Sequence, residues 1–195
     1  MTRPRTYSDA GQAFPIYITV VAGLLFLALA YLAVGQAAVN RGGAQTAADA
    51  AALAAAQNRR DQLAGKWVED VLDPTKWQAD FEGRVPLEPS CWRADQLALQ
   101  NEATAHCDSP EPLVFTVDAT TKKSVGDSIV PGSENYKSTA HARAVIQPLC
   151  GPPGGDAGKD ALPLLTCNGR EWHLNPDDLT DLPKPEDLFD VHLAD

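Results

Sequence analysis

Four cysteines are the residues best suited to covalent or metal chemistry in this 195-residue chain. Their order leaves 15, 42 and 16 residues between neighbours, so no C-x-x-C pair is present, and only His106 stands beside a cysteine. This spacing argues against a zinc site. An even number of cysteines is instead typical of disulfides in an oxidising compartment, the alternative being four buried thiols of a cytosolic domain. The residues concerned are Cys91, Cys107, Cys150 and Cys167.

Two pairings are preferred, Cys91 with Cys107 and Cys150 with Cys167, and the other two connectivities stay open. A straight helix from Cys91 to Cys107 would hold their ends about 24 Å apart, so this pair needs a short helix and a chain reversal. The second pair closes a loop rich in glycine and proline.

No catalytic or cofactor-binding constellation occurs at a recognisable spacing. The four histidines are scattered, and the stretch GPPGG lacks the Lys-Ser/Thr and the helix of a phosphate-binding loop. Asp177 and Asp178 have no alternating calcium ligands around them. We therefore expect no enzymatic activity, no cofactor and no metal.

The formal net charge of −10 argues against nucleic acid, and against an anionic lipid surface, as partners of the soluble part. Much of this charge lies in residues 171–195, which contain eight acidic residues and one basic residue, Lys184. Such a run is typical of a solvated segment.

Residues 12–40 are predicted to form a transmembrane helix, because no charge lies between Ala10 and Asn40 and about twenty apolar residues cross ~30 Å of hydrocarbon. A cleaved signal sequence is the alternative, but its apolar region is usually only about 7–15 residues long. Arginines on both sides leave the orientation undecided. The cysteines place the soluble part outside, with residues 1–11 as a short cytoplasmic segment.

An alanine-rich helix is expected over residues 41–73, outside the membrane. Its alanines recur at spacings of four, three and four and so share one helix face, which we expect to pack closely against other helices. An exposed stalk is the alternative. Gly42 and Gly43 make an unbroken rod from the membrane doubtful. The expected helix-packing residues are Gly35, Ala44, Ala48, Ala51 and Ala55.

The rest of the chain predicts a small, loop-rich α+β domain over residues 74–170, because 13 of the 15 prolines follow residue 73. Residues 113–120 and 138–146 alternate apolar and polar side chains and are predicted to pair as antiparallel strands. The four tryptophans are interpreted as core anchors. The fold class is therefore α+β, with a long N-terminal helix, a short antiparallel sheet and disulfides.

The stretch from Asp9 to Gln57, and most specifically AQTAADAAALAAA, resembles the N-terminal helix of the TadE/TadG-like family of Tad-type Flp pilus-assembly proteins, which are minor pilin or pseudopilin-like. The resemblance implies a single-pass protein of the cytoplasmic membrane with an exterior domain. It also implies a role in assembling a pilus or a related secretion apparatus.

The resemblance makes Gly11 a candidate processing site. Processed members of this group carry glutamate and an aromatic residue after the cleaved glycine, whereas Ile16 stands in the place of the glutamate before Tyr17. We therefore predict no cleavage after Gly11.

The function expected is that of a non-enzymatic membrane component of such an apparatus, packing through its N-terminal helix with other pilus or secretion membrane proteins. Membrane lipid and a homo- or hetero-oligomer are the expected partners. The alternative is a disulfide-stabilised cell-surface binding module for which the helix is a stalk.

Overall fold

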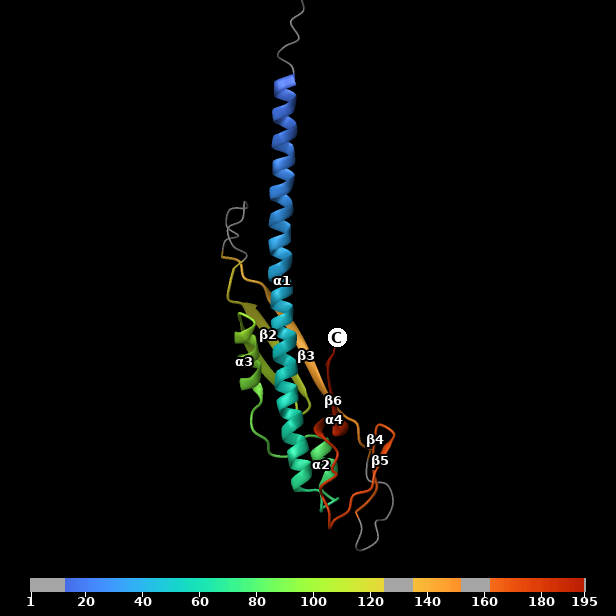
Figure 1. Ribbon diagram of the computed structural model, residues 1–195. Coiled ribbons are helices and arrows are strands. Elements are labelled where there is room, and N and C mark those ends of the chain that lie inside the picture. The colour runs from blue at the N-terminus through green and yellow to red at the C-terminus, as the bar shows by residue number, and fades with distance from the viewer. Residues whose placement is uncertain (1–12, 125–134, 152–161, 195) are drawn as a thin grey trace, which may run out of the picture.

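The computed structural model describes residues 13–124, 135–151 and 162–194 (Figure 1). A long helix projects from a small domain built around an antiparallel sheet, so the expected α+β fold is confirmed. The elements are α1 (Ala13–Glu69), α2 (Trp77–Phe81), α3 (Cys91–Gln100), β1 (Ala103–Glu111), β2 (Val114–Thr121), β3 (Thr139–Pro148), β4 (Leu165–Cys167), β5 (Arg170–Trp172), α4 (Pro185–Leu188) and β6 (Phe189–Ala194).

Helix α1 is continuous over 57 residues, which corresponds to about 85 Å. The expected break at Gly42 and Gly43 is wrong. Each glycine costs a helix about 1 kcal/mol relative to alanine, but the alanines that follow have the best helix propensity and are packed on the domain. Continuous hydrogen bonding across the glycine pair is therefore retained.

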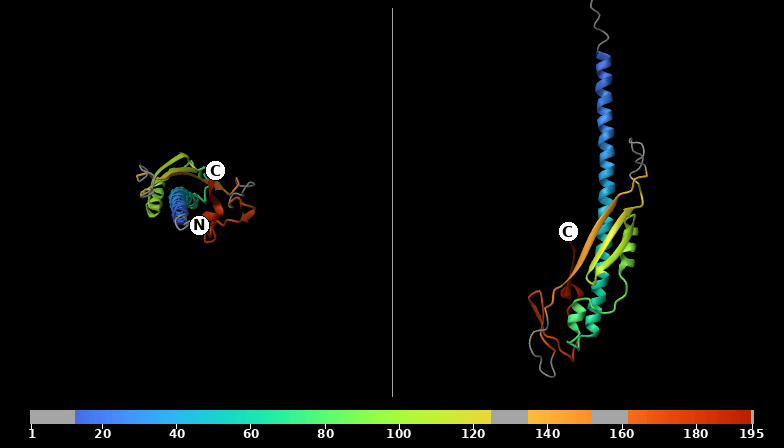
Figure 2. Two further views of the ribbon diagram at one scale, coloured as in Figure 1. Left: turned by 90° about the horizontal axis from the view of Figure 1, so that it is seen from above. Right: turned by 180° about the vertical axis from the view of Figure 1, so that it is seen from behind.

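Four strands form the main sheet in the order β1-β2-β3-β6, and every neighbouring pair is antiparallel. In β2 the apolar residues Phe115, Val117 and Ala119 are buried, as the alternation predicted. The predicted pairing of the two central strands is also confirmed, with Val117 opposite Ala142. Helices α1 and α3 lie together in the concave side of the sheet (Figure 2).

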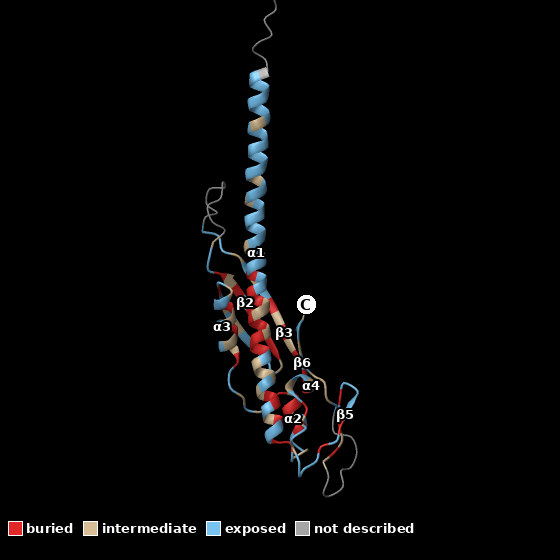
Figure 3. Ribbon diagram, viewed as in Figure 1, coloured by how far each residue is buried: buried red, intermediate tan, exposed pale blue. Residues whose placement is uncertain are grey.

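The alanine face of α1 is buried against this sheet and α3 (Figure 3). Small side chains also cover the facing parts of the domain, so the helix and the strands approach closely. These buried alanines are Ala44, Ala48, Ala51 and Ala55 on α1, with Ala94 and Ala98 on α3 and Ala103, Ala119, Ala142 and Ala144 on the strands.

Larger side chains fill the core where α1 ends. The ring centroids of Trp67 and Trp77 lie 5.7 Å apart, and Phe81 bridges Trp67 to Phe189. Trp67, Trp77 and Trp172 are buried, as expected of core anchors, whereas Trp92 is exposed.

The acidic C-terminal segment is part of the fold, which corrects its interpretation as a solvated run. Strand β6 pairs with β3, and Leu188 and Phe189 are fully buried. The acidic side chains of Glu186 and Asp190 stay exposed, because the apolar residues between and around them are the ones that face the core. Exposed negative charges and buried apolar anchors therefore coexist in one segment.

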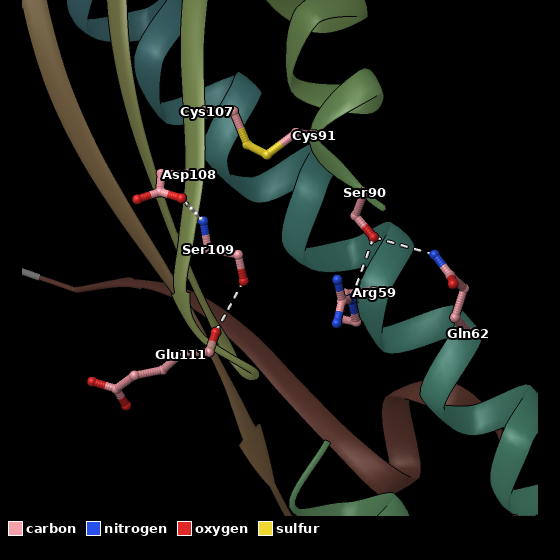
Figure 4. The surroundings of a disulfide bond; sticks show 8 residues. All are labelled: Arg59, Gln62, Ser90, Cys91, Cys107, Asp108, Ser109 and Glu111. Atoms are coloured by element: carbon pink, nitrogen blue, oxygen red, sulfur yellow. Dashed lines mark hydrogen bonds between the residues drawn. A yellow bond between two sulfur atoms is a disulfide. The ribbon is translucent and has the colours of Figure 1, made fainter. Parts of the chain in front are cut away.

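Both preferred disulfides are formed. Cys91 begins α3 and joins Cys107 of β1 with a Cα–Cα distance of 5.6 Å, so the chain reverses after a ten-residue helix (Figure 4). Beside this bridge, the Ser90 hydroxyl accepts a hydrogen bond from Nε2 of Gln62 at 3.2 Å, which links α3 to α1. The second bridge, Cys150–Cys167, holds the hairpin β4–β5 to the end of β3.

Candidate membrane and helix-packing surface

The N-terminal half of α1 projects beyond the domain as an exposed apolar rod (Figure 3). Phe14, Tyr31 and Val39 expose 72%, 80% and 77% of their surfaces. A soluble monomer rarely exposes a contiguous apolar surface of this extent, which marks a membrane or protein contact. Helix α1 is also long and apolar enough to cross a membrane.

The uncharged part of the projecting helix has the length of a bilayer. Residues 14–40 extend for about 40 Å, against about 40–45 Å for hydrocarbon and head groups together. Arg41 is the first charged residue after the span and therefore falls near one membrane surface. The backbone of the span satisfies its own hydrogen bonds as a helix, which the bilayer interior requires.

Three segments of the domain meet at the point where α1 leaves it, and we call them the rim: residues 101–102, 121–124 and 136–138. The amide of Lys122 donates a hydrogen bond to the carbonyl of Glu102 at 2.7 Å, and the amide of Thr121 donates to the carbonyl of Ser138 at 2.9 Å. These bonds hold the ends of β2 and β3 beside the end of α3. The rim thus lies on the side of the domain from which the apolar rod projects (Figure 2).

Two grooves separate the rim from α1. The first has a volume of about 590 Å³ and runs between Gly35 and Val39 on the helix and Asn101 and Lys123 on the rim. The second, of about 710 Å³, lies between Ala38 and Arg41 on one side and Tyr136 on the other. The helix wall of the first groove is mostly apolar and its rim wall is polar, whereas Arg41 and Gln45 add polar groups to the helix wall of the second groove.

The predicted helix-packing residues divide into two groups. Ala44, Ala48, Ala51 and Ala55 are fully buried within their own chain, so in this conformation they are not available to companion helices, which corrects their expected intermolecular role. Their small size serves the contact with the sheet and α3. Gly35 is different, because it is exposed and lines the first groove.

The other sequence predictions concern chemistry. Among the described residues no group of three metal-ligating side chains comes together. His141 lies on the outer face of the sheet, where its Nδ1 is 3.0 Å from Oδ1 of Asp118, and both side chains are exposed. Gly11 and most of the GPPGG stretch fall outside the described residues.

A buried carboxylate that sequence reasoning missed lies at the opposite end of the domain. Both carboxylate oxygens of Asp80 are buried without a hydrogen-bond partner among the described residues. Burial, and to a smaller extent the nearby negative charge of Asp70, raises the pKa of Asp80 to about 6. Asp70 itself is held by Lys76 at 2.9 Å and Lys66 at 3.3 Å, and the Lys76 hydrogen bond is the main cause that lowers its pKa.

We predict that Asp80→Asn stabilises the protein at neutral pH. The native state holds the Asp80 proton up to about pH 6, whereas an unfolded chain loses it near pH 3.8, so this group's stabilising contribution is lost as pH rises between these values. The amide cannot ionise, and the gain above pH 7 should be on the order of 2 kcal/mol. Chemical denaturation at pH 5 and pH 7.5 measures it, and an equal effect of the substitution at both pH values would contradict it.

The comparisons with known proteins agree with the projecting helix. A family model described as "Putative Flp pilus-assembly TadE/G-like" matches residues 11–58, about a quarter of the chain. This match confirms the resemblance to the TadE/TadG-like family that the N-terminal helix indicated. No curated protein and no solved structure matches the chain.

The matched segment contains the projecting part of α1 and continues into the part that packs on the domain. It covers the whole apolar rod and most of the alanine face, and it stops before the aromatic core and the sheet. The match and the apolar helix together support the interpretation that this chain is a membrane protein and a component of a Tad-type pilus system. The domain after residue 58 is outside the match.

Proposed function

We propose that this chain is a non-enzymatic membrane component of a Tad-type pilus or a related secretion apparatus, packing with partner helices through the projecting half of α1. The observation that carries the proposal is that the family match contains the whole of the exposed apolar rod. In the proposed topology residues 1–11 are cytoplasmic and the disulfide-linked domain is extracytoplasmic. The two disulfides support this side, because they persist in an oxidising compartment.

Gly35 is proposed as the centre of the helix-packing face. A Cβ atom added at this position would meet no atom of the described chain within 4 Å beyond its neighbours in the helix. Glycine is therefore not required there by the chain's own packing. Small residues in membrane helices allow a neighbouring helix to approach closely, and Gly35 is exposed on the projecting half of α1.

Gly35→Leu should weaken the association with partner helices without changing the fold. Loss of close approach is expected to lower the yield of crosslinked complexes about fivefold, equivalent to about 1 kcal/mol. A photo-crosslinking residue placed at Leu32, which is 60% exposed, followed by detergent purification from the native host, would measure this yield.

Gly23→Leu is the matched control. Gly23 lies on the same exposed helix, and a Cβ added there also meets open space. It is twelve residues before Gly35, so it points about 120° away from Gly35 around the helix axis. Equal yields in both variants and the native chain would contradict the packing role. Such a result would favour the alternative function, a surface binding module on a stalk.

A further inference from the structure

Positive charge gathers at the rim of a protein that is strongly acidic overall. Lys122, Lys123 and Lys137 are exposed on the rim, and Arg41 is exposed on α1 beside it. Glu102 is the acidic residue of the rim, and it is 2.7 Å from the ammonium group of Lys123. Among the described residues of the rim together with Arg41, four cations therefore stand against one anion.

The depth of these cations follows from the span. If residues 14–40 cross the bilayer, Arg41 and the rim lie at the level of the head groups. Tyr136 is 69% exposed on the rim, and tyrosine is a residue favoured at this level because its ring is apolar and its hydroxyl is polar.

The first groove has an apolar wall and a polar wall, which match the apolar chains and the polar head group of a lipid. Tyr31, Leu32 and Val39 give it an apolar wall that continues into the span. The rim wall carries Asn101, Glu102 and Lys123, and the Lys123 ammonium group donates to both carboxylate oxygens of Glu102. An acyl chain would follow the helix, while a phosphate group would meet the Lys123 ammonium group in competition with Glu102. Asn40, which also lines the groove, has an amide nitrogen with no hydrogen-bond partner among the described residues.

We propose that the rim and Arg41 bind the head groups of anionic phospholipids in the leaflet where α1 leaves the bilayer. The inference depends on the membrane span and is independent of any pilus partner. The net charge argued against an anionic lipid surface as a partner of the soluble part. However, screening limits the reach of each exposed charge to roughly 8–10 Å. A lipid at the rim therefore meets the local lysines and not the distant acidic end of the domain.

The test uses the full chain reconstituted in vesicles of equal phosphatidylglycerol and phosphatidylcholine, extracted in mild detergent and analysed by native mass spectrometry. The rim variant is Lys122→Gln, Lys123→Gln and Lys137→Gln together. The control variant is Arg84→Gln, Arg93→Gln and Lys184→Gln together, which changes the net charge equally but leaves the rim intact. Near-ultraviolet circular dichroism checks that both are folded.

Retained phosphatidylglycerol should exceed phosphatidylcholine about threefold in the native chain and the control variant. In the rim variant the ratio should fall close to the background set by the remaining cations, Arg3, Arg5 and Arg41. Asp127 and Glu134 lie between the rim segments in sequence and are present in every sample. Equal ratios in the rim and control variants would overturn the proposal. A rim variant that loses self-association but keeps its lipid ratio would overturn it too, because a second copy would then occupy the groove.

Discussion

Ala48→Leu combined with Ala51→Leu should unfold much of the domain or detach it from α1. Both alanines are fully buried where α1 meets the sheet and α3, and the facing strand residues are also alanines. Each added isobutyl group must therefore displace backbone. Overpacking of a close contact costs roughly 1–3 kcal/mol per site, which is a large share of the 5–15 kcal/mol by which a domain is stable.

Thermal unfolding of the purified full-length protein in detergent, followed by near-ultraviolet circular dichroism, measures this loss. Gln57→Leu is the matched control, because Gln57 is on the same helix and is exposed. It should change the midpoint little. An unfolding midpoint of the double alanine variant equal to that of the control would show that the alanine face is not packed inside its own chain.

Removal of the Cys91–Cys107 bridge has the second largest expected effect. The bridge closes a loop with a sequence separation of 16 and joins the first residue of α3 to the edge strand β1. In the loop-entropy description such a crosslink stabilises by about 3 kcal/mol. Cys91→Ser with Cys107→Ser should therefore lower the denaturation midpoint strongly and release α3 before the rest of the domain.

Hydrogen exchange resolved along the chain would locate the change, with residues 91–111 losing protection first. Ser109→Ala serves as the control, because Ser109 is exposed near the bridge and the substitution removes the hydrogen bond that its hydroxyl donates to the carbonyl of Glu111 (Figure 4). Protection of α3 that is unchanged by the cysteine substitutions would contradict a role of this bridge in holding α3.

The two central strands could be predicted because their alternation is strong and each has one buried face. Strand β1 was missed because its sequence, ATAHCDSPE, carries few large apolar residues and follows a helical pattern directly. Strand β6 has the alternation Phe189, Val191, Leu193, which the surrounding acidic residues obscured. The hairpin β4–β5 had a usable signal in Asn168-Gly169, both of which adopt positive φ values as a tight hairpin turn requires.

By itself the sequence determined the membrane-length helix, because length, apolarity and the absence of charge are local properties that need no partner. It also favoured a close contact for the alanine face over the alternative of an exposed stalk, since small side chains on one helix face let another element approach closely. What that face contacts was decided only by the tertiary structure. Strand pairing brings Ala119 and Ala142 from distant parts of the chain onto α1, where a partner helix had been expected.

The rim and the Asp80 environment were likewise decided by tertiary structure. Arg41, Lys122 and Lys137 are far apart in sequence and gather only because the ends of β2 and β3 meet beside α1. Asp80 is one carboxylate among many until α2 folds against the end of α1 and excludes water from it. Charge density and burial depend on distances in space, and the linear order of residues does not contain those distances before the chain is folded.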